Sequence, residues 1–130
     1  MFLKLLSRNE KENFLELAHY IAESDDYYAE TEKRWIEKIK RNLGMTDYEP
    51  TGKPFDQIMD ELKDSSVISK ASILLDILAL TMADHSYRTT ERNIIKKIRN
   101  RWDISDEQYR SIIFWMENKD QMLKAEGLEE

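Results

Sequence analysis

The chain has 130 residues, a net charge of −6 and no cysteine, so we expect one domain with its own hydrophobic core. Disulfides and cysteine-ligated zinc are excluded, and the acidic balance is not that of a general nucleic-acid binder. With three glycines, two prolines and 35% charged residues, helix-forming residues dominate. No run of alternating β-branched residues is present, so the sequence predicts an all-α protein.

The apolar segments resemble neither a signal peptide nor a membrane span. The N-terminal stretch MFLKLL is broken by Lys4 and lacks the long apolar region of a signal peptide. The longest apolar stretch, from Val67 to Ala83, contains Lys70 and Asp76 and is short for a membrane span. We therefore expect a cytoplasmic protein in which this stretch is a buried core helix.

The first part of the chain predicts two helices joined by a turn at residues 25–28. The first helix covers about 8–24 and opens with a capping box formed by Ser7 and Glu10. The second covers about 30–42, and Gly44 is a natural stop. Apolar residues recur at helical spacing in both: Phe14, Leu17, Ala18 and Ile21, then Trp35, Ile36, Ile39 and Leu43.

A connector over residues 45–53 follows, because Pro50 and Gly52 interrupt any regular element. Pro54 is well placed to open a short helix. The buried side of that helix is expected to be Phe55, Ile58, Met59 and Leu62. Ser65 or Ser66 can then cap a helix over about 67–83, which is apolar on most sides and is therefore expected to be central to the core.

The last part of the chain predicts a second turn at 84–88 and two more helices. One helix covers about 89–102, with Ile94, Ile95, Ile98 and Trp102 inside. Ser105 and Gln108 form a capping box that opens the sixth helix, whose inner residues are Tyr109, Ile112, Ile113 and Met116. The acidic tail from about Ala125 is expected to fray.

The two halves of the chain align without gaps at an offset of 59 residues, with eight identities over the 24 positions of 24–47 and 83–106. The identities are Asp25/Asp84, Tyr28/Tyr87, Thr31/Thr90, Glu32/Glu91, Ile36/Ile95, Lys38/Lys97, Ile39/Ile98 and Asp47/Asp106. Several are polar turn residues, which helical periodicity alone does not force to coincide. We predict repeat units over about 10–48 and 69–107 that share one core in a single domain, residues 1–130.

At these turns the sequence resembles the TerB (tellurite resistance) family and its TerB-like relatives. The matching pattern is an Asp, an apolar residue shortly after it and a Glu early in the next helix: Asp25, Tyr28 and Glu32, then Asp84, Tyr87 and Glu91. The resemblance covers roughly residues 10–118. The glycine that follows Asp in the family is here Asp26 or His85. The resemblance implies an all-helical fold of about six helices, a non-enzymatic role in stress response or signalling, and cation binding by acidic residues.

The repeated carboxylates Asp25, Glu32, Asp84 and Glu91 have two interpretations. If the repeats pack about a pseudo-twofold axis, the four groups converge and could hold Ca²⁺, Mg²⁺ or Mn²⁺ through oxygen ligands. Alternatively, each Asp accepts hydrogen bonds from free backbone N–H groups at a helix start, and each Glu is favoured there by the helix dipole. His85 could join such a site, whereas His19 is expected to be a packing or surface residue.

Basic residues are also repeated, on the predicted second and fifth helices. They are Lys33, Arg34, Lys38, Lys40 and Arg41, and Arg92, Lys96, Lys97, Arg99 and Arg101. A solvated helix face explains them, and a membrane surface or an acidic protein is the sharper alternative. Another protein is the expected partner, a homodimer stays open, and nucleic acid is disfavoured.

The sequence contains none of the common motifs of an active site, such as a glycine-rich phosphate loop, a nucleophile elbow or a cysteine nucleophile. We therefore expect a non-enzymatic TerB-like module with a divalent cation at the paired turns. A structural scaffold or dimerising interaction module without metal is the alternative.

Overall fold

A computed structural model describes residues 6–23, 30–81 and 89–125 of the chain. The helices are α1 (Arg8–Glu23), α2 (Glu30–Asn42), α3 (Phe55–Leu62), α4 (Val67–Thr81), α5 (Thr89–Arg101) and α6 (Asp106–Ala125). The described residues contain no strand, which confirms the predicted all-α class. The two predicted turns and the acidic tail fall outside the described residues, except for Ala125 at the end of α6.

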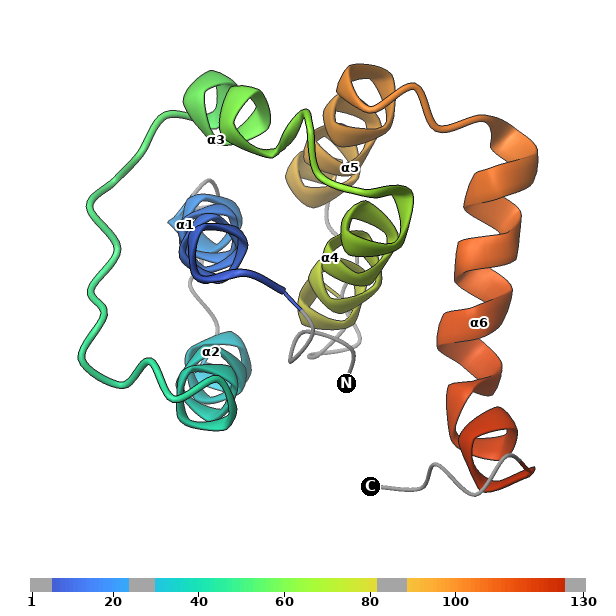
Figure 1. Ribbon diagram of the computed structural model, residues 1–130, viewed down its shortest axis with the longest axis horizontal. Helices are drawn as coiled ribbons and strands as arrows, with labels where there is room; N and C mark the ends of the chain where they lie inside the picture. The colour runs from blue at the N-terminus through green and yellow to red at the C-terminus, as the bar shows by residue number, and fades with distance from the viewer. Residues whose placement is uncertain (1–5, 24–29, 82–88, 126–130) are drawn as a thin grey trace.

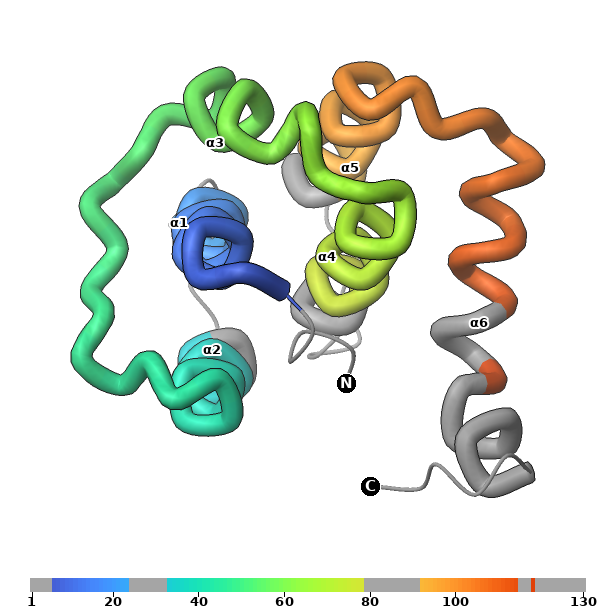
Figure 2. Tube along the Cα trace, viewed as in Figure 1, coloured from blue at the N-terminus to red at the C-terminus, as the bar shows by residue number. Residues whose placement is uncertain are grey.

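The helices form a bundle in which α1 is the most enclosed (Figure 1). It packs against α2, α3 and α4, and the connector between α2 and α3 runs along its outer side (Figure 2). Helix α4 also packs against α2 and α6, while α6 lies at the edge of the molecule. The shared core contains Phe14, Ile58, Leu74 and Ile98, none of which is exposed.

The predicted capping residues form the expected hydrogen bonds at three helix starts. The N–H of Ser7 donates to Oε1 of Glu10 over 2.9 Å, and the N–H of Glu10 donates to Oγ of Ser7 over 3.2 Å. The same reciprocal pair forms between Ser105 and Gln108. At α4 it is Ser66, rather than Ser65, whose Oγ accepts from a backbone N–H, that of Ser69. Polar side chains therefore fix where these helices begin.

Positions that the predicted repeat aligns adopt matching geometry at their helix ends. Helices α2 and α5 begin and end 59 residues apart, and α1 and α4 begin 59 residues apart. Gly44 and Asp103, which the repeat aligns, both have positive φ, 67° and 55°. Each follows a helix closed by two N–H to C=O bonds in the Schellman pattern: those of Gly44 and Met45, and those of Asp103 and Ile104.

This shared geometry predicts opposite effects of substitution at the two aligned positions. Asp103→Gly relieves the cost of a left-handed non-glycine residue and should raise the free energy of unfolding, by up to about 1 kcal/mol. Gly44→Ala should lower it by about 1 kcal/mol through backbone strain alone, because nothing lies within 4 Å of an added Cβ. Urea denaturation measures both changes. A loss of stability in Asp103→Gly would contradict the assigned helix end.

Helix α4 differs from its prediction at its first turn. Ile73, Leu74, Ile77 and Leu78 are buried as expected, but Val67 is 80% exposed and Ile68 is 72% exposed. Helix α4 shares the centre of the core with α1, in which every residue from Asn13 to Ala18 is buried. The apolar start of α4 is therefore surface, which the hydrophobic pattern alone did not indicate.

Among the described residues, the model has no helix with both the length and the apolar character needed to cross a bilayer.

Candidate functional site

The predicted acidic site falls partly outside the described residues. Asp25 and Asp84 lie outside the described residues. Glu32 and Glu91 are the third residues of α2 and α5, but only their backbone is described. Both glutamates thus belong to the first helical turn, as both interpretations of the repeated carboxylates require.

No other cluster of metal-ligating side chains occurs in the part of the chain that the structure describes. His19 lies on α1 with Nε2 3.9 Å from Oε1 of Glu23, one turn along the same helix. His19 is half-buried, within its expected role as a packing or surface residue. His85 falls outside the described residues.

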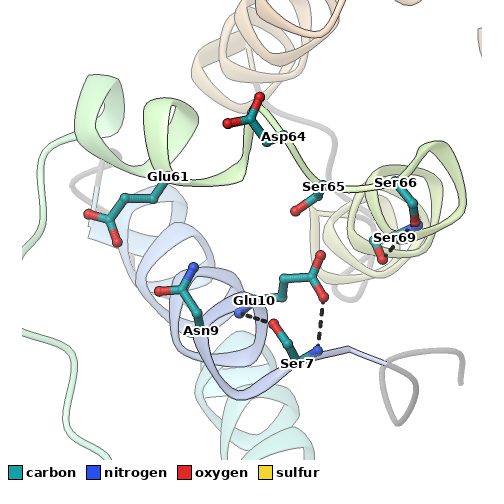
Figure 3. Close-up of a pocket in the computed structure, with 8 residues that line it drawn as sticks. All are labelled: Ser7, Asn9, Glu10, Glu61, Asp64, Ser65, Ser66 and Ser69. Atoms are coloured by element: carbon teal, nitrogen blue, oxygen red, sulfur yellow. Dashed lines mark hydrogen bonds between the residues drawn. The ribbon is translucent and has the colours of Figure 1, made fainter.

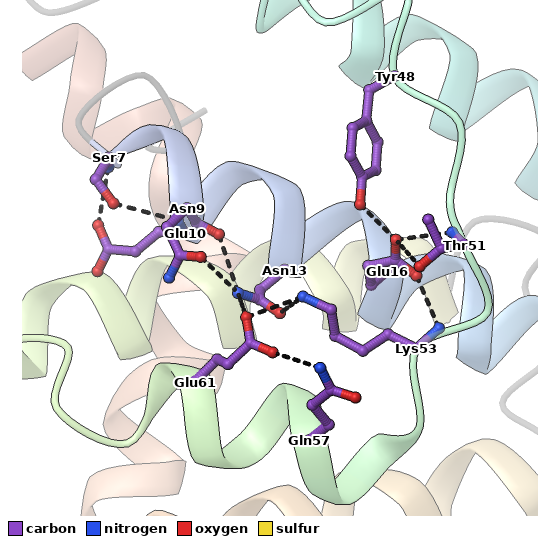
Figure 4. A network of polar contacts seen from close by, with 10 residues as sticks. All are labelled: Ser7, Asn9, Glu10, Asn13, Glu16, Tyr48, Thr51, Lys53, Gln57 and Glu61. Atoms are coloured by element: carbon purple, nitrogen blue, oxygen red, sulfur yellow. Dashed lines mark hydrogen bonds and ion pairs between the residues drawn. The ribbon is translucent and has the colours of Figure 1, made fainter.

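A buried carboxylate, Glu16, forms the centre of a polar network that joins α1 to the connector (Figure 4). Its side chain projects from α1 to the connector, and the residue is 1% exposed. One oxygen accepts a hydrogen bond from the hydroxyl of Tyr48, from the N–H of Thr51 over 2.8 Å and from the Thr51 hydroxyl over 3.2 Å. The other accepts from the N–H of Lys53 over 3.1 Å. Glu16 therefore holds a segment that has no secondary structure of its own.

These hydrogen bonds decide the charge of Glu16. Burial disfavours the ionised carboxylate, but the donors from Tyr48, Thr51 and Lys53 outweigh it and hold the pKa of Glu16 below its ordinary value. Burial and the neighbouring carboxylate together raise the pKa of the Tyr48 hydroxyl. Tyr48 therefore stays protonated and donates to an ionised Glu16.

A second part of the network joins α1 to α3. The ammonium of Lys53 lies 2.9 Å from Oδ1 of Asn13 and 3.0 Å from Oε1 of Glu61. Gln57 also donates to Glu61, over 2.9 Å. The bond from Lys53 is the main cause that lowers the pKa of Glu61. Each charged group here is paired within the chain, so we interpret the network as a structural clamp on the connector.

The sequence prediction missed Glu16, although one pattern could have indicated it. Glu16 stands between Leu15 and Leu17, in the apolar second half of α1, where each residue from Asn13 to Ala18 is buried. A carboxylate in such a helix is buried and needs donors. The donors come from a connector about 35 residues later in the chain, and a local pattern does not reveal that contact.

A polar pocket of about 470 Å³ opens between the starts of α1 and α4 (Figure 3). It is lined by Ser7, Asn9, Glu10, Glu61, Asp64, Ser65, Ser66 and Ser69. Much of its polar lining is already used: Ser7 and Glu10 cap α1, Ser66 caps α4, and Glu61 pairs with Lys53. The capping bond and nearby serine hydroxyls lower the pKa of Glu10 against the opposing effect of burial. The polar side chains of the pocket therefore act mainly as caps for the starts of α1 and α4.

A groove of different character lies between α4 and α6. Its volume is about 590 Å³. The apolar residues that line it are Val67, Ala71, Trp102, Ile104 and Ile112, and the polar ones are Lys70, Asp103, Glu107, Gln108 and Ser111. Of the lining residues, Val67 is 80% exposed, and Phe114, 56% exposed, lies on the next turn of α6. Large apolar groups left on a surface beside a hollow are typical of a binding site.

The predicted basic faces are partly taken up by ion pairs within the chain. Lys40 is buried and lies 3.4 Å from Glu49, and its repeat counterpart Arg99 lies 2.6 Å from Asp106. Arg101 reaches Asp56 and Asp60 of α3. Arg34, Lys38 and Arg41 are exposed on α2. These exposed side chains fit a solvated face, and an anionic partner for them stays a prediction.

Comparisons of the chain with known protein families, with curated proteins and with solved structures found no match in any of the three.

Proposed function

We propose that this chain is a non-enzymatic, TerB-like helical module, formed by duplication of one helical unit, that acts in stress response or signalling by binding another protein. The observation that carries the proposal is the groove between α4 and α6, in whose lining Val67 is 80% exposed. Elsewhere in the described residues, the clustered polar side chains bind other parts of the same chain. They clamp the connector, cap helices or form ion pairs. The matched ends of α2 and α5 support the duplication.

Position-resolved cross-linking in the cell tests the groove. A photoreactive amino acid at Val67 or Ser111, both of which line the groove, should trap a partner protein. The same group at Arg34, exposed on α2, serves as the control and should not trap it. Equal adducts from all three positions, or none from Val67 and Ser111, would argue against binding in the groove.

The alternative is a dimerising module, and the same experiment separates it. Self-association gives cross-linked adducts of the chain with itself, and light scattering of the purified protein then reports twice the monomer mass. The proposal predicts a monomer by light scattering and adducts with a different protein.

The proposal includes a divalent cation, Ca²⁺, Mg²⁺ or Mn²⁺, held by Asp25, Glu32, Asp84 and Glu91. Its support is the repeat, together with the equal position of Glu32 and Glu91 at the third residue of α2 and α5. Titration of chelator-treated protein should give binding heat and a higher melting temperature, because a ligand of the native state stabilises it. The double variant Glu32→Gln with Glu91→Gln should lose both effects. No heat and no stabilisation at millimolar metal would remove the cation from the proposal.

A further inference from the structure

The groove between α4 and α6 has two exposed carboxylates along one edge. Asp103, at the end of α5, and Glu107, in the first turn of α6, both line it and are exposed. Neither forms an ion pair with any residue that the structure describes. The one cation in the lining, Lys70, donates from Nζ to the backbone oxygen of Lys63 over 2.7 Å. The groove therefore offers an apolar floor and two carboxylates that form no ion pair among the described residues.

The shape of the groove favours a helix as occupant. It is bounded by two helices packed side by side, and a third helix can place its side-chain ridges between them. An extended strand would find no strand edge to pair with in the described part of the chain. A helix with apolar residues at i, i+3, i+4 and i+7 presents one apolar stripe to such a floor.

A second copy of this chain fits the groove poorly. Its net charge of −6 works against approach to the carboxylates of Asp103 and Glu107. Its basic helices α2 and α5 have their apolar faces buried in the core, through residues such as Ile39 and Ile98. They cannot present an apolar and a basic side together.

We infer that the groove between α4 and α6 receives a basic amphipathic helix of a partner protein, whose apolar stripe covers Val67, Ala71 and Ile112 while its Lys or Arg residues pair with Asp103 and Glu107. This inference rests on the proposed protein-binding function and specifies the chemistry of the partner. Complementary charge sets orientation and association rate, and the apolar stripe supplies most of the affinity.

The test uses two synthetic helical peptides with the full chain, measured by calorimetry. Both carry leucine at i, i+3, i+4 and i+7; one has lysine at the remaining positions and the other has glutamate. The leucine–lysine peptide should bind at a single site, at least about tenfold more tightly than the leucine–glutamate peptide.

Matched charge variants locate the site. Asp103→Asn with Glu107→Gln should weaken the leucine–lysine peptide by about threefold to tenfold, since each exposed pair contributes up to about 1 kcal/mol. Asn suits the positive φ of residue 103. The control, Glu23→Gln with Asp47→Asn, removes the same charge from exposed positions away from the groove and should change the affinity less than twofold.

The outcomes separate the inference from the function it rests on. Equal weakening by both charge variants would mean general attraction to an acidic protein and would overturn the inference, as would equal binding of the two peptides. The variant Val67→Gln with Ile68→Gln should weaken both peptides. If it weakens neither, the groove itself is not the binding surface and the proposed function fails as well.

Discussion

Glu16→Gln should lower the free energy of unfolding by about 3 kcal/mol, measured by urea denaturation at pH 7. The carboxylate is buried and accepts hydrogen bonds from Tyr48, Thr51 and Lys53. Hydrogen bonds to a charged group are among the stronger ones, and an amide offers one acceptor oxygen in place of two. The matched control is Glu12→Gln on the same helix, whose partly exposed ion pair with Arg8 contributes up to about 1 kcal/mol.

The effect of Glu16→Gln should depend on pH in a defined direction. The pKa of Glu16 is lowered in the folded chain from an ordinary value of 4.5, so ionised Glu16 stabilises the fold above that pH. The contribution is lost as pH falls from 4.5 through the lower, folded pKa. The stability difference between wild type and Glu16→Gln should therefore shrink on acidification. A difference that stays constant from pH 7 down to pH 3 would show that ionised Glu16 does not hold the connector.

The variant Tyr48→Phe tests the same contact from the side of the hydrogen-bond donor. It removes the hydroxyl that donates to Glu16 and should lower the free energy of unfolding by about 1 kcal/mol. The double variant with Glu16→Gln should lose less free energy of unfolding than the two single variants added together, because both substitutions act on the same hydrogen bond.

Leu74→Ala should lower the free energy of unfolding by about 2–5 kcal/mol, whereas Ile68→Ala on the same helix should change it by less than about 0.5 kcal/mol. Leu74 is fully buried in the core, and Ile68 is 72% exposed. Removing a buried side chain leaves a cavity, while an exposed one loses little on truncation. Chemical denaturation of both variants gives the comparison. Similar losses would mean that the start of α4 is packed in the native state and is not free to meet a partner.

The sequence predicted the helices well, because their ends are encoded by nearby residues. The Ser7–Glu10 and Ser105–Gln108 capping boxes and Gly44 each act within a few positions of a helix end. Apolar spacing likewise identified the buried side of α3, from Phe55 to Leu62. In each case the residue and its structural effect are neighbours in the chain.

The features that the sequence did not predict depend on contacts between distant segments. Glu16 is explained only by a connector that follows α2, and the exposure of Val67 and Ile68 only by where α6 lies relative to α4. Helical periodicity marks residues as apolar without saying whether another helix covers them. The groove is for this reason a property of the assembled bundle.

The most direct measurement of the central claim is the affinity of the cross-linked partner for two forms of the chain, wild type and Val67→Gln with Ile68→Gln. The double variant lies in the exposed first turn of α4 and keeps its Ser66 cap, so its stability should match wild type within about 0.5 kcal/mol. Binding in the groove predicts that calorimetry finds at least about tenfold weaker affinity for this variant. Equal affinities at equal stability would place the partner elsewhere and contradict the proposed function.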